Sequence, residues 1–103
     1  GSNAYREPGY VEVDFIEHNG GTAEGRFAIT AVYTDLSSQW TVRASGFGKN
    51  LESVKQVDEI AHRRIPFSVV HYHPDNDRSI LKVLFERVRQ TSGVRLSRSR
   101  PYK

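Results

Sequence analysis

Residues 10–18 read YVEVDFIEH, and the rest of the chain is best interpreted outward from this stretch. The apolar residues Val11, Val13 and Phe15 alternate with positions on the opposite face, which is the period of a β-strand. Asp14 lies among the opposite-face positions. A carboxylate carried by a core strand is a candidate ligand for a hard divalent cation, because such cations prefer oxygen ligands. The stretch predicts a strand with a candidate metal ligand at Asp14.

Two further strand patterns follow. Residues 26–34 (RFAITAVYT) are rich in β-branched and aromatic side chains, and residues 39–44 (QWTVRA) resume the pattern after a short turn. Glycines at 20–21 mark the turn after the first strand. Residues 10–44 therefore predict an antiparallel meander, with Trp40 expected to pack in the core.

The period then changes to that of a helix. Asn50 can cap a helix whose apolar positions recur at helical spacing: Leu51, Val54, Val57, Ile60 and Ala61. Pro66 follows this pattern and indicates that the helix ends before it, because proline lacks the backbone N–H that a helix interior needs. Residues 66–72 (PFSVVHY) predict a fourth strand.

A second helix and a last strand complete the pattern. Asp77 or Ser79 can cap a helix with one apolar face, formed by Leu81, Leu84, Phe85 and Val88. Gly93 stands where a helix C-terminal glycine belongs, and residues 94–97 (VRLS) predict a fifth strand. The order βββαβαβ predicts an α/β fold with a mixed five-stranded sheet and flanking helices.

Composition narrows the classes of protein. A chain of 103 residues forms one domain with a modest core. The absence of cysteine excludes disulfides, thiolate metal sites and cysteine nucleophiles. No apolar run approaches the roughly 20 residues of a membrane span, so we expect a cytoplasmic protein without a membrane partner. Residues 1–4 (GSNA) are interpreted as a tag remnant, which leaves residues 5–103 as a single domain fragment.

Basic residues gather in the last third of the chain, although the net charge is only +3. From Pro66 onward these residues are Arg78, Lys82, Arg87, Arg89, Arg95, Arg98, Arg100 and Lys103. Such a distribution suits a phosphate-rich partner such as DNA. A solvated helix face followed by a solubilising tail is the alternative interpretation.

Several segments, in this order, resemble the catalytic core of retroviral-type integrases and insertion-sequence transposases, the DDE recombinases of the RNase H-like superfamily. Residues 13–21 (VDFIEHNGG) resemble the first-strand motif, which puts the first catalytic acid at Asp14. Residues 31–40 (AVYTDLSSQW) resemble the turn between the second and third strands, where Asp35 is a structural position. The resemblance implies an RNase H-like fold.

The second half of the chain carries the rest of the resemblance. Residues 73–77 (HPDND) resemble the T-D-N-G element that holds the second acid, here Asp75. Residues 97–103 (SRSRPYK) resemble the S-x-P-Y segment that leads to the helix with the third acid. That third acid would lie about 35 residues beyond Asp75, after Lys103, so the fragment is expected to be inactive alone.

The resemblance implies a DNA transposase or integrase that cuts and joins DNA ends by two-metal phosphoryl transfer. Asp14 and Asp75 would be both catalytic residues and ligands of Mg²⁺, with Mn²⁺ as the alternative cation. Transposon ends and target DNA would be the partners, with Arg98, Arg100 and Lys103 contacting phosphates. The family also implies a homodimer or a higher oligomer.

Three alternatives stay open from the sequence. Asp77 stands where the family has glycine, which favours a non-catalytic DNA-binding or assembly module derived from a decayed transposase. A nuclease acting on RNA–DNA hybrids would share the fold. The spacing His71-x-His73-x-Asp75 superficially resembles a zinc hydrolase motif, but the chain is too short for that fold. The two histidines are better interpreted as a pair at a strand end.

Overall fold

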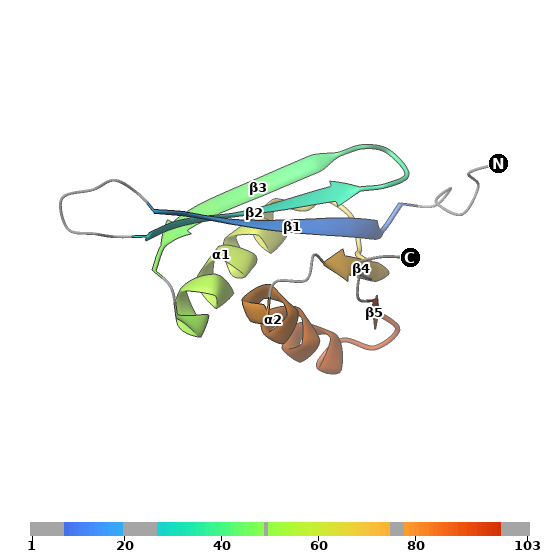
Figure 1. The fold of residues 1–103 in the computed structure, drawn as a ribbon. Helices are drawn as coiled ribbons and strands as arrows, with labels where there is room; N and C mark the ends of the chain where they lie inside the picture. The colour runs from blue at the N-terminus through green and yellow to red at the C-terminus, as the bar shows by residue number, and fades with distance from the viewer. Residues whose placement is uncertain (1–7, 20–26, 49, 75–77, 98–103) are drawn as a thin grey trace, which may run out of the picture.

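The computed structural model describes residues 8–19, 27–48, 50–74 and 78–97 (Figure 1). Its elements, in chain order, are β1 (Tyr10–Asn19), β2 (Phe27–Asp35), β3 (Thr41–Phe47), α1 (Leu51–Arg64), β4 (His71–Pro74), α2 (Arg78–Arg89) and β5 (Arg95–Leu96). The predicted order βββαβαβ is confirmed. Among the described residues, no helix combines the length and the apolar character that crossing a bilayer requires.

The five strands form one mixed sheet in the order β3-β2-β1-β4-β5. The first three strands pair antiparallel, as the predicted meander requires. β4 then pairs parallel to β1, and β5 pairs parallel to β4. The central strand β1 therefore has an antiparallel neighbour on one side and a parallel neighbour on the other. This pairing places β1, which carries Asp14, in the middle of the sheet and beside β4.

Both helices pack on the same face of the sheet (Figure 1). Val11, Val13 and Phe15 point to this face and are buried, which confirms the predicted alternation of β1. We call the opposite side of the sheet the open face, because no described helix covers it. By strand register, it carries Tyr10, Glu12, Asp14 and Ile16 of β1, Thr30, Val32 and Thr34 of β2, Thr41, Arg43 and Ser45 of β3, His71 and His73 of β4, and Arg95 of β5.

The predicted cap of α1 is confirmed. The Asn50 side chain accepts hydrogen bonds from the backbone N–H and the hydroxyl of Ser53, each at 2.9 Å. The helix packs closely on β3 at Gly46, where a Cβ atom would lie 2.9 Å from Cγ2 of Val57. This close contact requires glycine at position 46, because a side chain there would push α1 away from the sheet.

Two strand predictions need correction at their ends. β3 begins at Thr41 because Gln39 has a left-handed backbone (φ 70°), which places residues 39–40 in the turn. Trp40 is consequently 52% exposed, so the expectation that it packs in the core was wrong. β4 covers residues 71–74, so it shares only residues 71–72 with the strand predicted over 66–72, because the segment before it connects α1 to the sheet.

The predicted apolar face of α2 was also partly wrong. The side chains that this helix buries are Ile80, Val83 and Leu84, whereas Phe85 is 57% exposed. Packing against the sheet and α1 buries a face of α2 that is shifted by about one residue from the face that periodicity predicted. The helix begins at Arg78, so Ser79 lies inside it and is not its cap. Asp77, the other predicted cap, lies outside the described residues.

Asp35 organises the turn between β2 and β3. Its buried carboxylate accepts hydrogen bonds from the backbone N–H of Gly9 at 2.8 Å, and from the N–H and hydroxyl of Ser38 at 2.9 and 2.6 Å. Burial raises the pKa of Asp35, but these hydrogen bonds outweigh it and the net pKa is lowered. The carboxylate has a structural position, as the sequence indicated.

We expect Asp35→Ala to lower the free energy of unfolding by about 2–3 kcal/mol, because the buried donor of Gly9 and both donors of Ser38 lose their acceptor. Ser38→Ala removes the hydroxyl alone and should cost about 1 kcal/mol. Urea unfolding of the two variants measures both values. An Asp35→Ala variant no less stable than Ser38→Ala would contradict the assigned role.

Candidate functional site

Asp14 lies in the middle of β1, on the open face. It pairs with Val32 of the neighbouring strand, and its side chain is exposed to solvent. A carboxylate in this position is held by a buried strand but remains accessible to an ion or a ligand. The predicted place of Asp14, on a strand and on the face opposite Val11, Val13 and Phe15, is confirmed, while its role in metal binding stays a prediction.

The parallel ladder between β1 and β4 brings the neighbourhood of the second acid to this strand. The ladder runs from Tyr10 paired with His71 to Val13 paired with Pro74. In the sequence, the next residue after Val13 is Asp14, and the next after Pro74 is Asp75. Asp75 itself lies outside the described residues, so its predicted role stays a prediction. The same holds for the predicted DNA contacts of Arg98, Arg100 and Lys103, which also lie outside them.

Asp14 shares its face of the sheet with a second carboxylate. Glu12 shares the open face two residues earlier on the same strand. Carboxylate oxygens suit Mg²⁺, so the residues that the chain offers fit this cation. In the part of the chain that the structure describes, no three His, Cys, Asp or Glu residues form a complete metal site. Further ligands would have to come from outside it.

His71 and His73 lie next to this strand, on the same open face. Their rings stack at a centroid distance of 4.4 Å, and the Tyr10 ring lies 5.6 Å from His71. Nε2 of His71 is 2.6 Å from the hydroxyl oxygen of Ser97. Burial lowers the pKa of His71, and electrostatic interactions with His73 and Arg95 lower it further. The sequence predicted from the alternating spacing that the two histidines share one side of the strand, and the structure confirms this.

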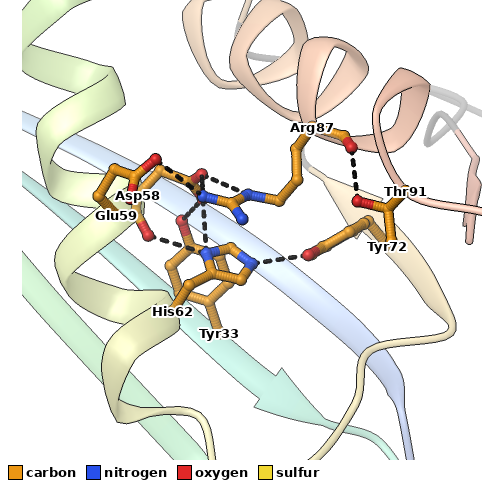
Figure 2. A network of polar contacts seen from close by, with 7 residues as sticks. All are labelled: Tyr33, Asp58, Glu59, His62, Tyr72, Arg87 and Thr91. Carbon is orange, nitrogen blue, oxygen red and sulfur yellow. Dashed lines mark hydrogen bonds and ion pairs between the residues drawn. The ribbon is translucent and has the colours of Figure 1, made fainter.

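A buried polar network on the helical side holds α1, α2 and the sheet together (Figure 2). At its centre is Asp58 of α1, which is 1% exposed. Tyr33 donates a hydrogen bond to its Oδ1 at 2.5 Å, and Arg87 of α2 donates to its Oδ2 at 2.8 Å. Sequence reasoning missed this network. The available signal was Asp58 itself, which lies directly beside Val57 on the apolar arc of α1.

His62 extends the network to β4. Its Nδ1 lies 2.8 Å from the backbone carbonyl of Asp58, so this nitrogen carries the hydrogen and donates. Its Nε2 lies 2.6 Å from the Tyr72 hydroxyl oxygen, within hydrogen-bond distance. Burial raises the pKa of the Tyr72 hydroxyl, which keeps it protonated. The strand that leads to Asp75 is thus tied to both helices.

The fold is RNase H-like, and this is shown by comparison with solved structures. A chain of the simian T-cell lymphotropic virus intasome, solved in complex with PP2A regulatory subunit B56 gamma, aligns with 95% of this chain at a TM-score of 0.70 and 13% identity. The alignment covers 34% of that chain. The HTLV-2 integrase catalytic core domain, in a dimeric form with magnesium, aligns with 86% of this chain at a TM-score of 0.64 and 12% identity, over 59% of its own length.

The catalytic core domain of BIV integrase is a third similar structure, with a TM-score of 0.51 and 15% identity over 89% of this chain and 56% of that one.

In sequence, the chain is 33% identical over 100 residues to an uncharacterised protein, y4rM, of Sinorhizobium fredii. The alignment covers 93% of this chain and 27% of that relative, so the chain spans about a quarter of its length. No family model matches.

Proposed function

We propose that the chain is part of the catalytic core of a DDE-type DNA transposase or integrase, which cuts DNA ends and joins them to target DNA. The observation that carries this proposal is the register of the β1–β4 ladder. The last described pair is Val13 with Pro74, and a carboxylate follows each of them in the sequence. Adjacent parallel strands that each lead into an acid are a suitable support for a shared cation site.

Asp14 and Asp75 would hold the divalent cations, Mg²⁺ or Mn²⁺, and orient them toward the open face, where a DNA strand has access. When bound, such cations activate the attacking hydroxyl and stabilise the leaving oxygen of a phosphoryl transfer. The network around Asp58 would keep β4 in register with β1, since Tyr72 lies three residues before Asp75 and is tied to His62 of α1.

The rest of the proposal follows the resemblance. A third acid, about 35 residues beyond Asp75 in the full-length protein, would complete the site, and the fragment without it would be inactive. Arg98, Arg100 and Lys103 would contact the phosphates of transposon ends or target DNA. The full-length protein would act in the cytoplasm as a homodimer or a higher oligomer.

A cation titration of the present chain tests whether Asp14 binds a divalent cation. We expect Mn²⁺ to broaden the amide resonances of β1 around Asp14, because a paramagnetic ion bound there relaxes nearby nuclei. Asp14→Asn should weaken Mn²⁺ binding by at least about tenfold, since it removes a charged ligand. NMR titration of both proteins measures the effect.

Glu17→Gln is the matched control, because Glu17 is an exposed acid on the same strand and the variant changes the charge equally. Its Mn²⁺ affinity should match that of the wild type. If wild-type β1 shows no broadening, or if both variants respond alike, Asp14 is not a metal ligand. The second candidate, a non-catalytic DNA-binding or assembly module, would then lead. The aspartate at position 77, where the family has glycine, already favours it.

A further inference from the structure

Three aromatic rings lie in a row on the open face, beside the strand that carries Asp14. The Tyr10 and His71 centroids are 5.6 Å apart with planes inclined at 42°, and the His71 and His73 rings stack at 4.4 Å and 22°. We call Tyr10, His71 and His73 the ring ladder. By register, Tyr10 lies beside His71 and Glu12 beside His73, so the ladder borders the segment that leads to Asp14.

A polar contact from the end of β5 reaches the middle ring of the ladder. Ser97, just after β5, lies within hydrogen-bond distance of Nε2 of His71 and fixes the orientation of that ring. The ring nitrogens of His73 make no hydrogen bond to any described residue. Both imidazoles are half-buried and lie on the face that no described helix covers. Because the two imidazoles stack on each other, their facing sides are covered, and bases could stack only on the outer ring faces of the ladder. The ring nitrogens of His73 add hydrogen-bonding capacity that the described residues do not use.

Positive charge adjoins the rings. Arg95 of β5 is exposed and pairs with His71 in the parallel β4–β5 ladder. Farther along the face, Arg43 pairs with Val32, which in turn pairs with Asp14. By strand order, Arg43 therefore lies on one side of β1 and Arg95 on the other. Aromatic rings next to arginines are the combination that stacks nucleobases and attracts their phosphates.

We propose that the ring ladder and Arg95 form a stacking platform for unpaired nucleotides of a DNA strand, next to Asp14. The choice of DNA rests on the proposed function. The preference for an unpaired strand follows from the rings, because stacking requires the faces of bases, which a duplex buries between neighbouring pairs. Arg95 would contact a phosphate of the same strand. The platform would hold the end of the strand on the face where Asp14 is accessible.

Fluorescence anisotropy with a labelled single strand of about twelve nucleotides, and with the duplex of the same sequence, tests the platform in EDTA. Under these conditions cation binding by the acids plays no part. We expect the single strand to bind more tightly than the duplex. His71→Ala and His73→Ala should each weaken single-strand binding by at least about fivefold. Arg95→Ala should reduce the slope of log affinity against log salt by about 0.7.

Two further variants separate stacking from other causes. His73→Phe keeps a ring at the site and should bind the single strand within about twofold of the wild type. Trp40→Ala is the matched control, because it removes an exposed aromatic ring from the β2–β3 turn, on the other side of β1 from the two histidines, and should leave binding unchanged. Circular dichroism verifies that each variant is folded.

Four results would overturn the platform: unchanged binding in folded His71→Ala and His73→Ala, an equal loss in Trp40→Ala, a loss in His73→Phe as large as in His73→Ala, or tighter binding to duplex than to single strand. None of them depends on Asp14. Failure of the platform is therefore distinct from failure of the proposed metal site, which the Mn²⁺ titration reports independently.

Discussion

Replacing either predicted acid should abolish the joining of DNA ends by the full-length protein and leave its DNA binding nearly intact. For Asp14→Asn and for Asp75→Asn we expect strand transfer to fall by at least about 10³-fold, because each variant removes several kcal/mol of stabilisation of the charge that develops at phosphorus. Asparagine keeps the size of the side chain, so the fold and the DNA-binding surface should persist. Strand-transfer assays on labelled ends, with gel-shift assays in parallel, measure the two properties separately.

Glu17→Gln again serves as the control, since it removes an exposed negative charge three residues from Asp14 without touching the proposed site. Its strand transfer should match that of the wild type. Retained joining in Asp14→Asn or Asp75→Asn would remove that residue from the mechanism. An inactive wild-type protein that still binds DNA would instead favour the non-catalytic module, and Asp77→Gly would then test whether the departure from the family's glycine is the cause.

The largest expected effect on stability comes from the buried network. Asp58→Ala should lower the free energy of unfolding by about 3–5 kcal/mol, because it leaves Arg87 partly buried without its partner and the Tyr33 hydroxyl without an acceptor. This is a large share of the roughly 5–15 kcal/mol that stabilises a domain. Urea unfolding monitored by circular dichroism measures the change. In the folded protein, no buried side-chain nitrogen or oxygen of the described residues lacks a hydrogen-bond partner, so the variant creates a defect that the wild type avoids.

Glu59→Ala is the matched control on the same helix. Glu59 is 62% exposed and its Oε2 lies 3.6 Å from Nη2 of Arg87, so its loss should change stability by less than about 0.5 kcal/mol. The double variant Asp58→Ala/Arg87→Ala should cost at least about 1 kcal/mol less than the sum of the single changes, because the two side chains are in direct contact. Additive losses, or equal losses for Asp58→Ala and Glu59→Ala, would contradict the network.

The pH dependence of the same variant has a definite sign. Burial raises the pKa of Asp58, but its contacts with His62, Tyr33 and Arg87 outweigh burial, so its folded-state pKa lies below the ordinary 3.8. A lowered folded-state pKa contributes stability that is fully present above 3.8 and is lost as the pH falls through the folded-state value. The stability difference between the wild type and Asp58→Ala should therefore shrink as the pH falls below 3.8.

Local patterns predicted the parts of the structure that depend on nearest neighbours. The alternation of Val11, Val13 and Phe15 identified β1 and its buried face, since side chains of a strand point to opposite sides. Asn50 identified the start of α1, because a cap satisfies amide groups within one helical turn. Predictions failed where several elements compete. Trp40 is exposed because the turn around Gln39 sets the start of β3, and Phe85 is exposed because α1 and the sheet choose which face of α2 is buried.

By itself, the sequence determined the order of strands and helices and the position of Asp14 on a core strand, because both follow from short-range periodicity. Only the tertiary structure decided which strands are neighbours. The parallel pairing of β1 with β4 joins segments about 60 residues apart and sets Val13 beside Pro74. It also decided that Asp58, Tyr33 and Arg87 meet, since a buried carboxylate must find its donors wherever the packed elements bring them.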